Sequence, residues 1–110
     1  MEISFATSKL AKLCNSEKKL RGAYGPRMAV LIQQRLLDLN AAETLETMRE
    51  VPGRCHALTG DVDGHFAVDL VHPDRLVFAP DHDPVPQLKG GGVDWSKVTK
   101  IEVVGIGDYH

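Results

Sequence analysis

The chain has 110 residues, of which 43% are hydrophobic and 25% charged, and its formal net charge is −2. This length and composition predict one compact domain, residues 1–110, with a small core. No stretch approaches the roughly 18 apolar residues that cross a bilayer, and the first ten residues lack the layout of a secretory signal, so a cytoplasmic protein without a membrane partner is expected.

The charge is unevenly distributed along the chain. Residues 1–27 carry six Lys and Arg side chains against two acids, whereas the spans 28–53, 54–80 and 81–110 each come to −2. A basic patch near the start is typical of nucleic-acid binders. A helix with a lysine-rich solvated face would give the same pattern, so both interpretations stay open.

The first half of the chain predicts helices after one short strand. The segment EISF (2–5) is a strand candidate, and Thr7 or Ser8 can cap a following helix that Asn15-Ser16 divides in two. The segment GPRMAVLIQQRLLDLN (25–40) is the clearest helix, because its proline suits the first turn and its apolar residues form one stripe.

A short third helix is expected next. Asn40 ends the long helix and, with Glu43 three residues later, can cap a helix through Leu45 and Met48. Pro52-Gly53 then terminates it.

From residue 54 the hydrophobic period changes to two. The runs RCHALT (54–59), HFAVDLV (65–71) and RLVFAP (75–80) are separated by turn residues, which predicts antiparallel strands. KIEVVGI (100–106) predicts another strand, with Ile101 and Val103 on one face and Val104 and Ile106 on the other. Because both faces are apolar, this strand should be central.

Residues 80–94 predict a long irregular loop, since they contain three prolines and three consecutive glycines, and Trp95 would hold this loop to the domain. The order of elements is strand, helices, then strands. This order predicts an α+β fold: a small, mainly antiparallel sheet with two to three N-terminal helices packed on one face.

Groups capable of acid–base chemistry stand at the ends of the expected strands. His56 begins the sheet region, Arg75 begins a strand, and Asp108, Tyr109 and His110 follow the last strand after a single glycine. Two imidazoles, an acid and a guanidinium at one rim of a sheet would make an acid–base site without a metal.

Simpler interpretations of these residues stay open. Arg75 can be a strand arginine paired with Asp61 or Asp69, and His56 can be a partly buried core histidine. The two cysteines, Cys14 and Cys55, lie far apart and the histidines show no ligand spacing, so neither a metal nor another cofactor is expected.

Four motifs in the second half of the chain resemble a known family when taken together. They are HALTGD (56–61), GHF (64–66), RLVF (75–78) and DYH (108–110). In this order and spacing they resemble the HigB branch of the RelE/ParE toxin superfamily. The resemblance covers residues 54–80 and 101–110, and it extends to the helical half only in layout.

The resemblance implies the toxin of a type II toxin–antitoxin system, of the kind that maintains plasmids. Such a toxin is a metal-independent endoribonuclease that cuts messenger RNA on the ribosome, and a cognate helix-turn-helix antitoxin neutralises it. Two other classes stay open: a ParE-like toxin that binds a topoisomerase without cutting RNA, and an inert protein retained for its antitoxin complex.

The resemblance also implies roles for residues. In attack of a ribose 2′-hydroxyl on the adjacent phosphate, His56 and His110 would serve as base and acid in either order, and Arg75 would hold the phosphate. Asp108 would orient an imidazole and Tyr109 would stack on a base or bond a phosphate oxygen. The basic residues expected to grip the RNA backbone are Lys18, Lys19 and Arg21.

Overall fold

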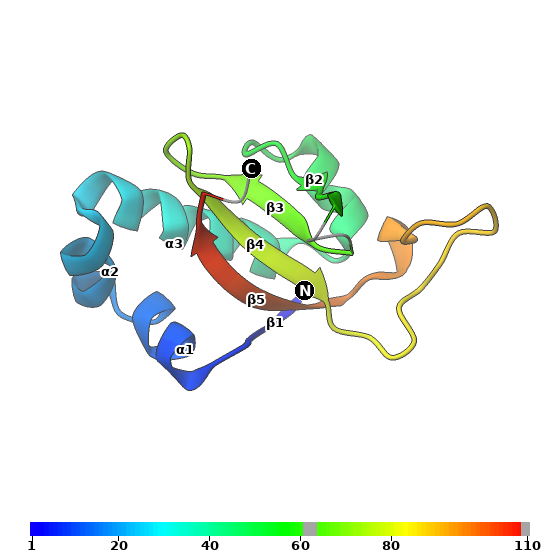
Figure 1. The fold of residues 1–110 in the computed structure, drawn as a ribbon, viewed down its shortest axis with the longest axis horizontal. Helices are drawn as coiled ribbons and strands as arrows, with labels where there is room; N and C mark the ends of the chain where they lie inside the picture. The colour runs from blue at the N-terminus through cyan, green and yellow to red at the C-terminus, as the bar shows by residue number, and fades with distance from the viewer. Residues whose placement is uncertain (61–63, 109–110) are drawn as a thin grey trace.

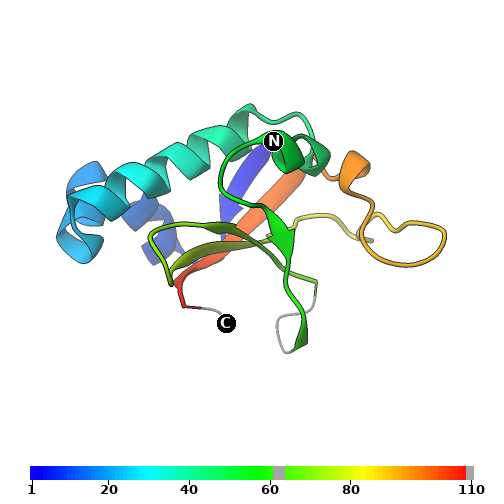
Figure 2. The same ribbon diagram turned by 90° about the horizontal axis from the view of Figure 1, so that it is seen from above.

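The computed structural model describes residues 1–60 and 64–108, which form a five-stranded mixed sheet with helices on one face (Figures 1 and 2). The strand order is β1-β5-β4-β3-β2. β1 is parallel to β5, and every other pair is antiparallel. The expected α+β layout is confirmed. The strands are β1 Glu2–Phe5, β2 His56–Ala57, β3 Phe66–Asp69, β4 Arg75–Pro80 and β5 Lys100–Gly107.

Two short helices follow β1, as the capping residues predict. α1 spans Ser8–Cys14 and α2 spans Glu17–Tyr24. The side chains of Thr7 and Ser16 each accept a hydrogen bond from the backbone N–H three residues later, at 3.1 and 3.2 Å. Each cap satisfies one N–H group that the first turn leaves without an intrahelical partner, and the expected division at Asn15-Ser16 is confirmed.

The longest helix, α3 at Pro26–Ala41, agrees with the sequence to within one residue at each end. The third helix is instead a 3₁₀ helix, η1 at Leu45–Glu50, and the cap expected from Asn40 is wrong. The chain is extended at Ala42, so Asn40 is not adjacent to η1, and its side-chain amide donates to the carbonyl oxygen of Met1 at 3.1 Å. None of the helices that the structure describes is long and apolar enough to span a membrane.

β2 is shorter than the strand expected over residues 54–59. Arg54 has a φ of 51°, a left-handed conformation that an extended strand cannot contain, so pairing starts only at His56. After Ala57 one further bond, from the N–H of Leu58 to the carbonyl oxygen of His65 at 2.9 Å, continues the contact with β3.

β5 lies between β1 and β4, which confirms its central position, but the expected distribution of its side chains is wrong in one place. The pairing with β4 shifts: Val77 lies opposite Gly105, and Phe78 lies opposite Val103. Val104 is therefore the extra residue of a bulge. Because a bulge reverses the alternation beyond it, Ile106 packs with the main core and only Val104 faces the other side.

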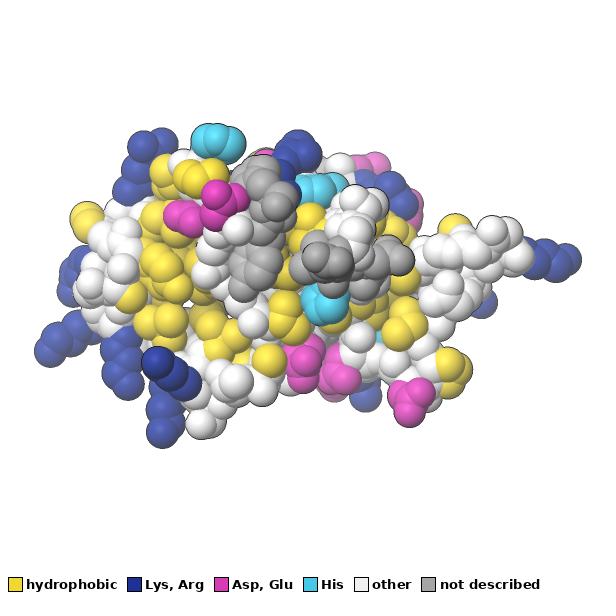
Figure 3. Space-filling model, in the orientation of Figure 1, with side chains coloured by type: hydrophobic (Ala, Val, Ile, Leu, Met, Phe, Trp, Pro, Cys, Tyr) yellow, Lys and Arg dark blue, Asp and Glu magenta, His cyan; other side chains and the backbone are white. Residues whose placement is uncertain are grey.

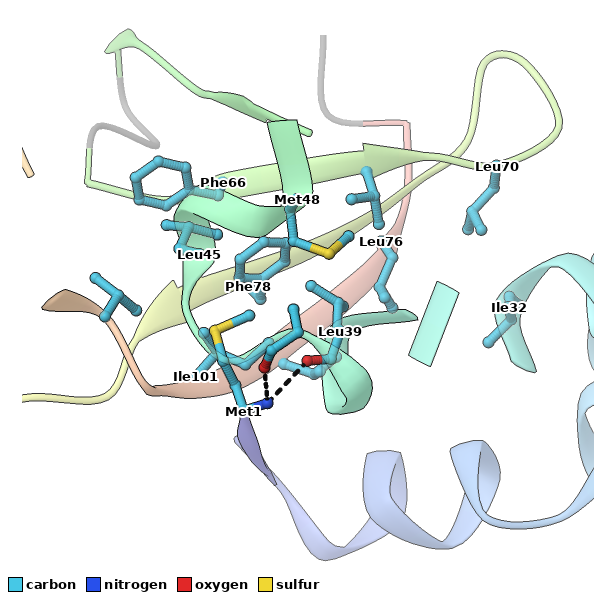
Figure 4. Packing of buried hydrophobic residues seen from close by; sticks show 14 of the residues in the cluster. Met1, Ile32, Leu39, Leu45, Met48, Phe66, Leu70, Leu76, Phe78 and Ile101 are labelled. Carbon is cyan, nitrogen blue, oxygen red and sulfur yellow. Dashed lines mark hydrogen bonds between the residues drawn. The ribbon is translucent and has the colours of Figure 1, made fainter. Parts of the chain in front are cut away.

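The main core lies between the helices and the sheet (Figure 4). Apolar side chains of α2, α3 and η1 meet those of β3, β4 and β5, and nearly all are fully buried. The amino group of Met1 adds a polar contact at this layer's edge, donating to the carbonyl oxygen of Leu39 at 3.1 Å. The largest fully buried side chains are Phe66, Phe78, Leu20, Ile32, Leu39, Leu45, Met48, Leu76 and Ile101.

The segment between β4 and the 3₁₀ helix η3 (Trp95–Lys97) extends away from the sheet (Figures 1 and 2). A single bridge joins Gln87 and Val93 within it. At its base the Trp95 ring meets Phe66 edge-on, with 5.0 Å between centroids, and the Arg49 guanidinium lies 3.8 Å from the Trp95 ring centroid. The expected attachment through Trp95 is confirmed.

Candidate functional site

The face of the sheet opposite the helices carries a small apolar cluster bordered by charged groups. Its buried members are Leu58, Ala67 and Val77, with Val104 packed against them. Figure 3 shows this face, on which hydrophobic side chains alternate with acidic, basic and imidazole groups. We call it the open face, and the polar residues at one end of it form the candidate site: Arg54, His56, Asp69 and Arg75.

The strand register brings two predicted site residues to the same end of the open face. Asp69 on β3 lies directly opposite Arg75 on β4, and Arg75 lies opposite Gly107 on β5. Residues opposite one another in a ladder share a face, so these three positions form a row across three strands. His56 pairs with Ala67, two residues before Asp69, and so faces the same side one strand further on.

The Asp69 carboxylate lies between two guanidinium groups. Arg54 donates to it through Nε at 2.8 Å and through an Nη at 3.2 Å, which is a forked, bidentate pair. Arg75 approaches the same carboxylate with its Nε at 3.5 Å. The Arg54 side chain is 62% exposed and that of Arg75 only 14%, so the two cations differ greatly in freedom to move.

Opposing effects act on the pKa of Asp69. Burial raises this pKa, but the hydrogen bonds from Arg54, with the charges of Arg54, His56 and Arg75, outweigh burial and leave it below its usual value. Asp69 is therefore a carboxylate at any pH near neutrality, and it is held among cations. The sequence alternative in which Arg75 pairs with Asp69 agrees with this geometry, whereas Asp61 lies outside the described residues.

The backbone of Asp69 is anchored on both sides. Its N–H donates to the carbonyl oxygen of Gly53 at 2.7 Å, and its carbonyl oxygen accepts from Arg35 Nε of α3 at 2.9 Å. The fit around Gly53 is tight: a Cβ there would lie 2.8 Å from that same Arg35 Nε. The end of β3 is thus fixed against both the helix and the 53–54 segment.

Arg54 also fixes the orientation of His56. The His56 Nδ1 lies 2.7 Å from the Arg54 carbonyl oxygen. A carbonyl oxygen can only accept, so Nδ1 carries the proton, and in the neutral ring Nε2 holds the free lone pair. The left-handed backbone of Arg54 thus brings its carbonyl to the imidazole and its side chain to Asp69.

The remaining sequence predictions divide into those the structure describes and those it does not. Gly107 is the residue opposite Arg75, so the chain leaves β5 beside that arginine, and the next residue, Asp108, is exposed. Tyr109 and His110 lie outside the described residues. The expected meeting of His110 with His56 therefore stays a prediction.

Lys18, Lys19 and Arg21, which were predicted to bind the RNA backbone, are exposed on α2. This helix lies toward the end of the molecule at which the turn joins β3 to β4 (Figures 1 and 2). Arg21 pairs with Glu17 of the same helix at 3.3 Å. Next to α2, a shallow groove of about 520 Å³ is lined by side chains that include Lys9, Lys12 and Lys19. Five of the six basic residues of the N-terminal region thus lie on α1 and α2.

Sequence reasoning missed Arg54 and Asp69 as members of the site. Together with Arg75 and the 70–74 turn they line a small cavity of about 70 Å³. A much larger groove of about 680 Å³ lies elsewhere, between β1, α1 and α3, and is lined mainly by apolar side chains including Phe5, Leu36 and Leu37. The residues of the candidate site and this larger groove are thus at separate places.

Metal-binding groups do not converge in the described part of the chain, where no three His, Cys, Asp or Glu side chains are placed to hold an ion. Burial raises the pKa of the Cys14 thiol to about 11. Burial also raises that of Cys55 to about 12, although the charge of Arg49 acts in the opposite direction. Both cysteines are thus neutral thiols at physiological pH.

Comparison with known proteins gives similarity in structure only. No family model matches the sequence, and no curated protein matches it. The structure of a YoeB-YefM complex from Staphylococcus aureus matches with a TM-score of 0.59 at 16% identity, covering 100% of this chain and 97% of that chain. A YoeB/ParE toxin from Agrobacterium tumefaciens matches with a TM-score of 0.60 at 14% identity, covering 100% of both chains.

At such low identity the similarity concerns the arrangement of helices and strands. It extends over the whole of this chain and 97–100% of the matched chains, including the helical half that the sequence motifs covered only in layout. The narrower HigB assignment stays a prediction. The chain therefore has the α+β fold of YoeB/ParE toxins, the RelE/ParE-like fold that its motifs led us to expect.

Proposed function

We propose that this protein is the toxin of a toxin–antitoxin pair and that it acts as a metal-independent endoribonuclease of the HigB type. The observation that carries the proposal is the row of Asp69, Arg75 and Gly107 on the open face, beside an imidazole of fixed tautomer. The groups that we propose as general base and phosphate-binding guanidinium thus belong to one end of one sheet, where the DYH tail also begins.

In the proposed reaction, His56 Nε2 removes the proton from a ribose 2′-hydroxyl, and the 2′-oxygen attacks the adjacent phosphorus. Arg75 balances the charge that develops on the phosphate oxygens. The bond from phosphorus to the 5′-oxygen then breaks, and His110 donates a proton to that oxygen. The products are a 2′,3′-cyclic phosphate and a free 5′-hydroxyl. General acid–base assistance of this kind contributes roughly 10²–10⁴-fold.

Asp108 and Tyr109 would complete this site, Asp108 by orienting an imidazole and Tyr109 by stacking on a base. Lys18, Lys19 and Arg21 would bind the RNA backbone without sequence preference, since phosphate contacts supply affinity rather than specificity. The substrate would be messenger RNA on the ribosome, in the cytoplasm.

The proposed partner is an antitoxin of the helix-turn-helix type. An antitoxin partner is supported by the fold shared with the matched structure of a YoeB-YefM complex. The helix-turn-helix type is what the HigB resemblance implies. A protein that cuts messenger RNA in the cell that makes it needs such an inhibitor.

The experiment measures RNA cleavage by the purified protein, first without ribosomes in excess chelator and then with ribosomes in a buffer that contains magnesium. We expect His56→Gln and Arg75→Lys to lower the rate by about 10²-fold or more, since each removes a group that acts on the transition state. The matched control is His82→Gln, because His82 Nε2 accepts from the backbone N–H groups of Thr99 and Lys100, where β5 begins, and a glutamine oxygen can accept the same bonds.

A second candidate function is favoured by the position of the groove of about 680 Å³. It lies between β1, α1 and α3, away from the imidazole site, and is mainly apolar. Such a surface suits a protein that acts by binding, either a ParE-like poison of a topoisomerase or an inert antitoxin-binding protein. Growth arrest that is equally strong for wild type, His56→Gln and Arg75→Lys would favour the topoisomerase binder, and no arrest from any of them would favour the inert protein.

A further inference from the structure

Two guanidinium groups on the open face converge on one carboxylate, and only one of them was expected to bind phosphate. Arg54 holds Asp69 through two hydrogen bonds, and Arg75 approaches the same carboxylate. The charge of His56 acts on this carboxylate as well. With one negative group among these, Arg54, Asp69 and Arg75 alone carry a net positive charge.

A carboxylate and a phosphodiester each present two acceptor oxygens. Both oxygens can lie in the plane of a guanidinium and accept from two of its N–H groups at once. We propose that Arg54 is a second phosphate-binding guanidinium, and that Asp69 occupies its fork until an RNA phosphodiester takes the place of the carboxylate. This inference rests on the proposed ribonuclease function, since it identifies RNA as the source of the phosphate.

The structure indicates which group moves. The Asp69 backbone is held by Gly53 on one side and by Arg35 on the other, so the carboxylate keeps its place. Arg75 is nearly buried, whereas the Arg54 side chain is 62% exposed and can turn toward a ligand. An exposed ion pair of this kind favours the paired over the separated side chains by only about two- to fivefold. A phosphodiester that Arg75 holds at the same time can therefore displace Asp69 from Arg54.

The left-handed backbone of Arg54 supports a role beyond stabilising the fold. Such a conformation is unfavourable for a residue with a side chain, and observed strain of this kind gathers at functional sites. Here this backbone brings the carbonyl oxygen of Arg54 to His56 and the guanidinium of Arg54 to Asp69, which Arg75 also approaches. A glycine would adopt this backbone without cost but would lack the cation.

The test measures equilibrium binding of a short 2′-O-methyl RNA by fluorescence anisotropy at low salt, because this RNA cannot be cut. Arg54→Gly should weaken binding by about tenfold and reduce the slope of log affinity against log salt by about 1, as expected for one lost phosphate contact. Asp69→Asn should strengthen binding by about two- to fivefold, because it frees the fork of Arg54.

The control for a general change of charge is Asp74→Asn. Asp74 lines the same small cavity, and the two hydrogen bonds that anchor it to the 70–74 turn come from its backbone. Asp69→Asn must strengthen binding more than Asp74→Asn does, and this difference must disappear when Arg54 is also glycine. Thermal melting of each variant checks that it is folded, and Arg54→Gly alone decides the question should Asp69→Asn not fold.

Weaker RNA binding by a folded Asp69→Asn protein would overturn the proposal, since Asp69 would then be holding the arginines in their binding positions. Unchanged binding by Arg54→Gly would overturn it too. These results are separate from the proposed catalysis: the wild-type protein can bind the uncut RNA through Arg54 and yet fail to cleave ordinary RNA, which would end the ribonuclease proposal alone.

Discussion

The two faces of the sheet are built from the same strands but differ in composition and burial. The face under the helices carries large apolar side chains, such as Phe66, Phe78 and Ile101, which are almost completely buried. Among the described residues, the open face has a small buried cluster of Leu58, Ala67 and Val77 at its centre, bordered by charged side chains.

The difference shows how one short sheet can combine stability with a polar site. Since side chains alternate along a strand, each strand can give one set of residues to the core and the other to the open face. In β4, Leu76 and Phe78 enter the main core while Arg75 joins the site. The covered face should thus determine stability, and the open face should determine activity.

The largest effect on stability is expected from Phe78→Ala on the covered face. Phe78 is fully buried and stacks on Phe66 at 6.0 Å between ring centroids. Its truncation should lower the free energy of unfolding by about 3–5 kcal/mol, because the apolar surface is lost and a cavity remains. Urea denaturation followed by circular dichroism measures this. A loss below 1 kcal/mol would mean that the covered face is not the main source of stability.

Arg75→Lys on the neighbouring position tests the opposite behaviour. Lysine keeps the charge but not the fork, so RNA cleavage should fall by about 10²-fold, equivalent to about 2.7 kcal/mol of transition-state stabilisation. The free energy of unfolding should change by less than about 1 kcal/mol, since the pair with Asp69 is long and partly exposed. A large loss of stability with unaltered cleavage would reverse the roles assigned to the two faces.

Val103 and Val104 offer the closest comparison, because these adjacent and identical residues of β5 face opposite sides. Val103 is fully buried in the main core, whereas Val104 packs half-buried against the open-face cluster. Val103→Ala should cost about 1.5–2.5 kcal/mol, near the value for two buried methyl groups with some cavity, and Val104→Ala about half as much. Equal losses, again from urea denaturation, would show that the open face contributes equally to the core.

The same strand shows where prediction from sequence succeeds and where it stops. Apolar residues on both sides of β5 correctly predicted a central strand. Simple alternation nevertheless put Ile106 with Val104, because a bulge depends on the pairing with β4 and not on the local pattern. The helices were predicted well for the converse reason: their caps and apolar stripe are local features, as the bonds to Thr7 and Ser16 illustrate.

The site follows the same rule. Arg75 and His56 were predicted as site residues because they belong to motifs within short stretches of sequence. Arg54 and Asp69 were not predicted as site residues, because their pairing joins positions 15 residues apart. It also depends on a left-handed backbone at Arg54, which the sequence does not indicate at an arginine. The available signal was Gly53, whose φ of 118° is one that residues with a side chain rarely adopt, and which lies against Arg35.

The smallest expected effect is the response of the open face to acid. The pKa of Asp69 is lower in the folded protein than in the unfolded chain, so its contribution to stability is complete above the unfolded value, near 3.9, and is lost as the pH falls through the folded value. Asp69→Asn should remove this part of the pH dependence. The difference between the two proteins should be below about 1 kcal/mol at neutral pH, since solvent screens a pair as exposed as Arg54 and Asp69, and should shrink further below pH 4.

Urea denaturation of both proteins between pH 7 and pH 3 measures this difference. The covered face supplies no comparable term, because none of the described residues is a buried charged or polar side chain. If the wild type instead gained stability relative to Asp69→Asn as the pH falls, the Asp69 carboxylate would oppose folding. The two arginines would then be held in place by some other group, and Asp69 would not be the stable occupant of the Arg54 fork.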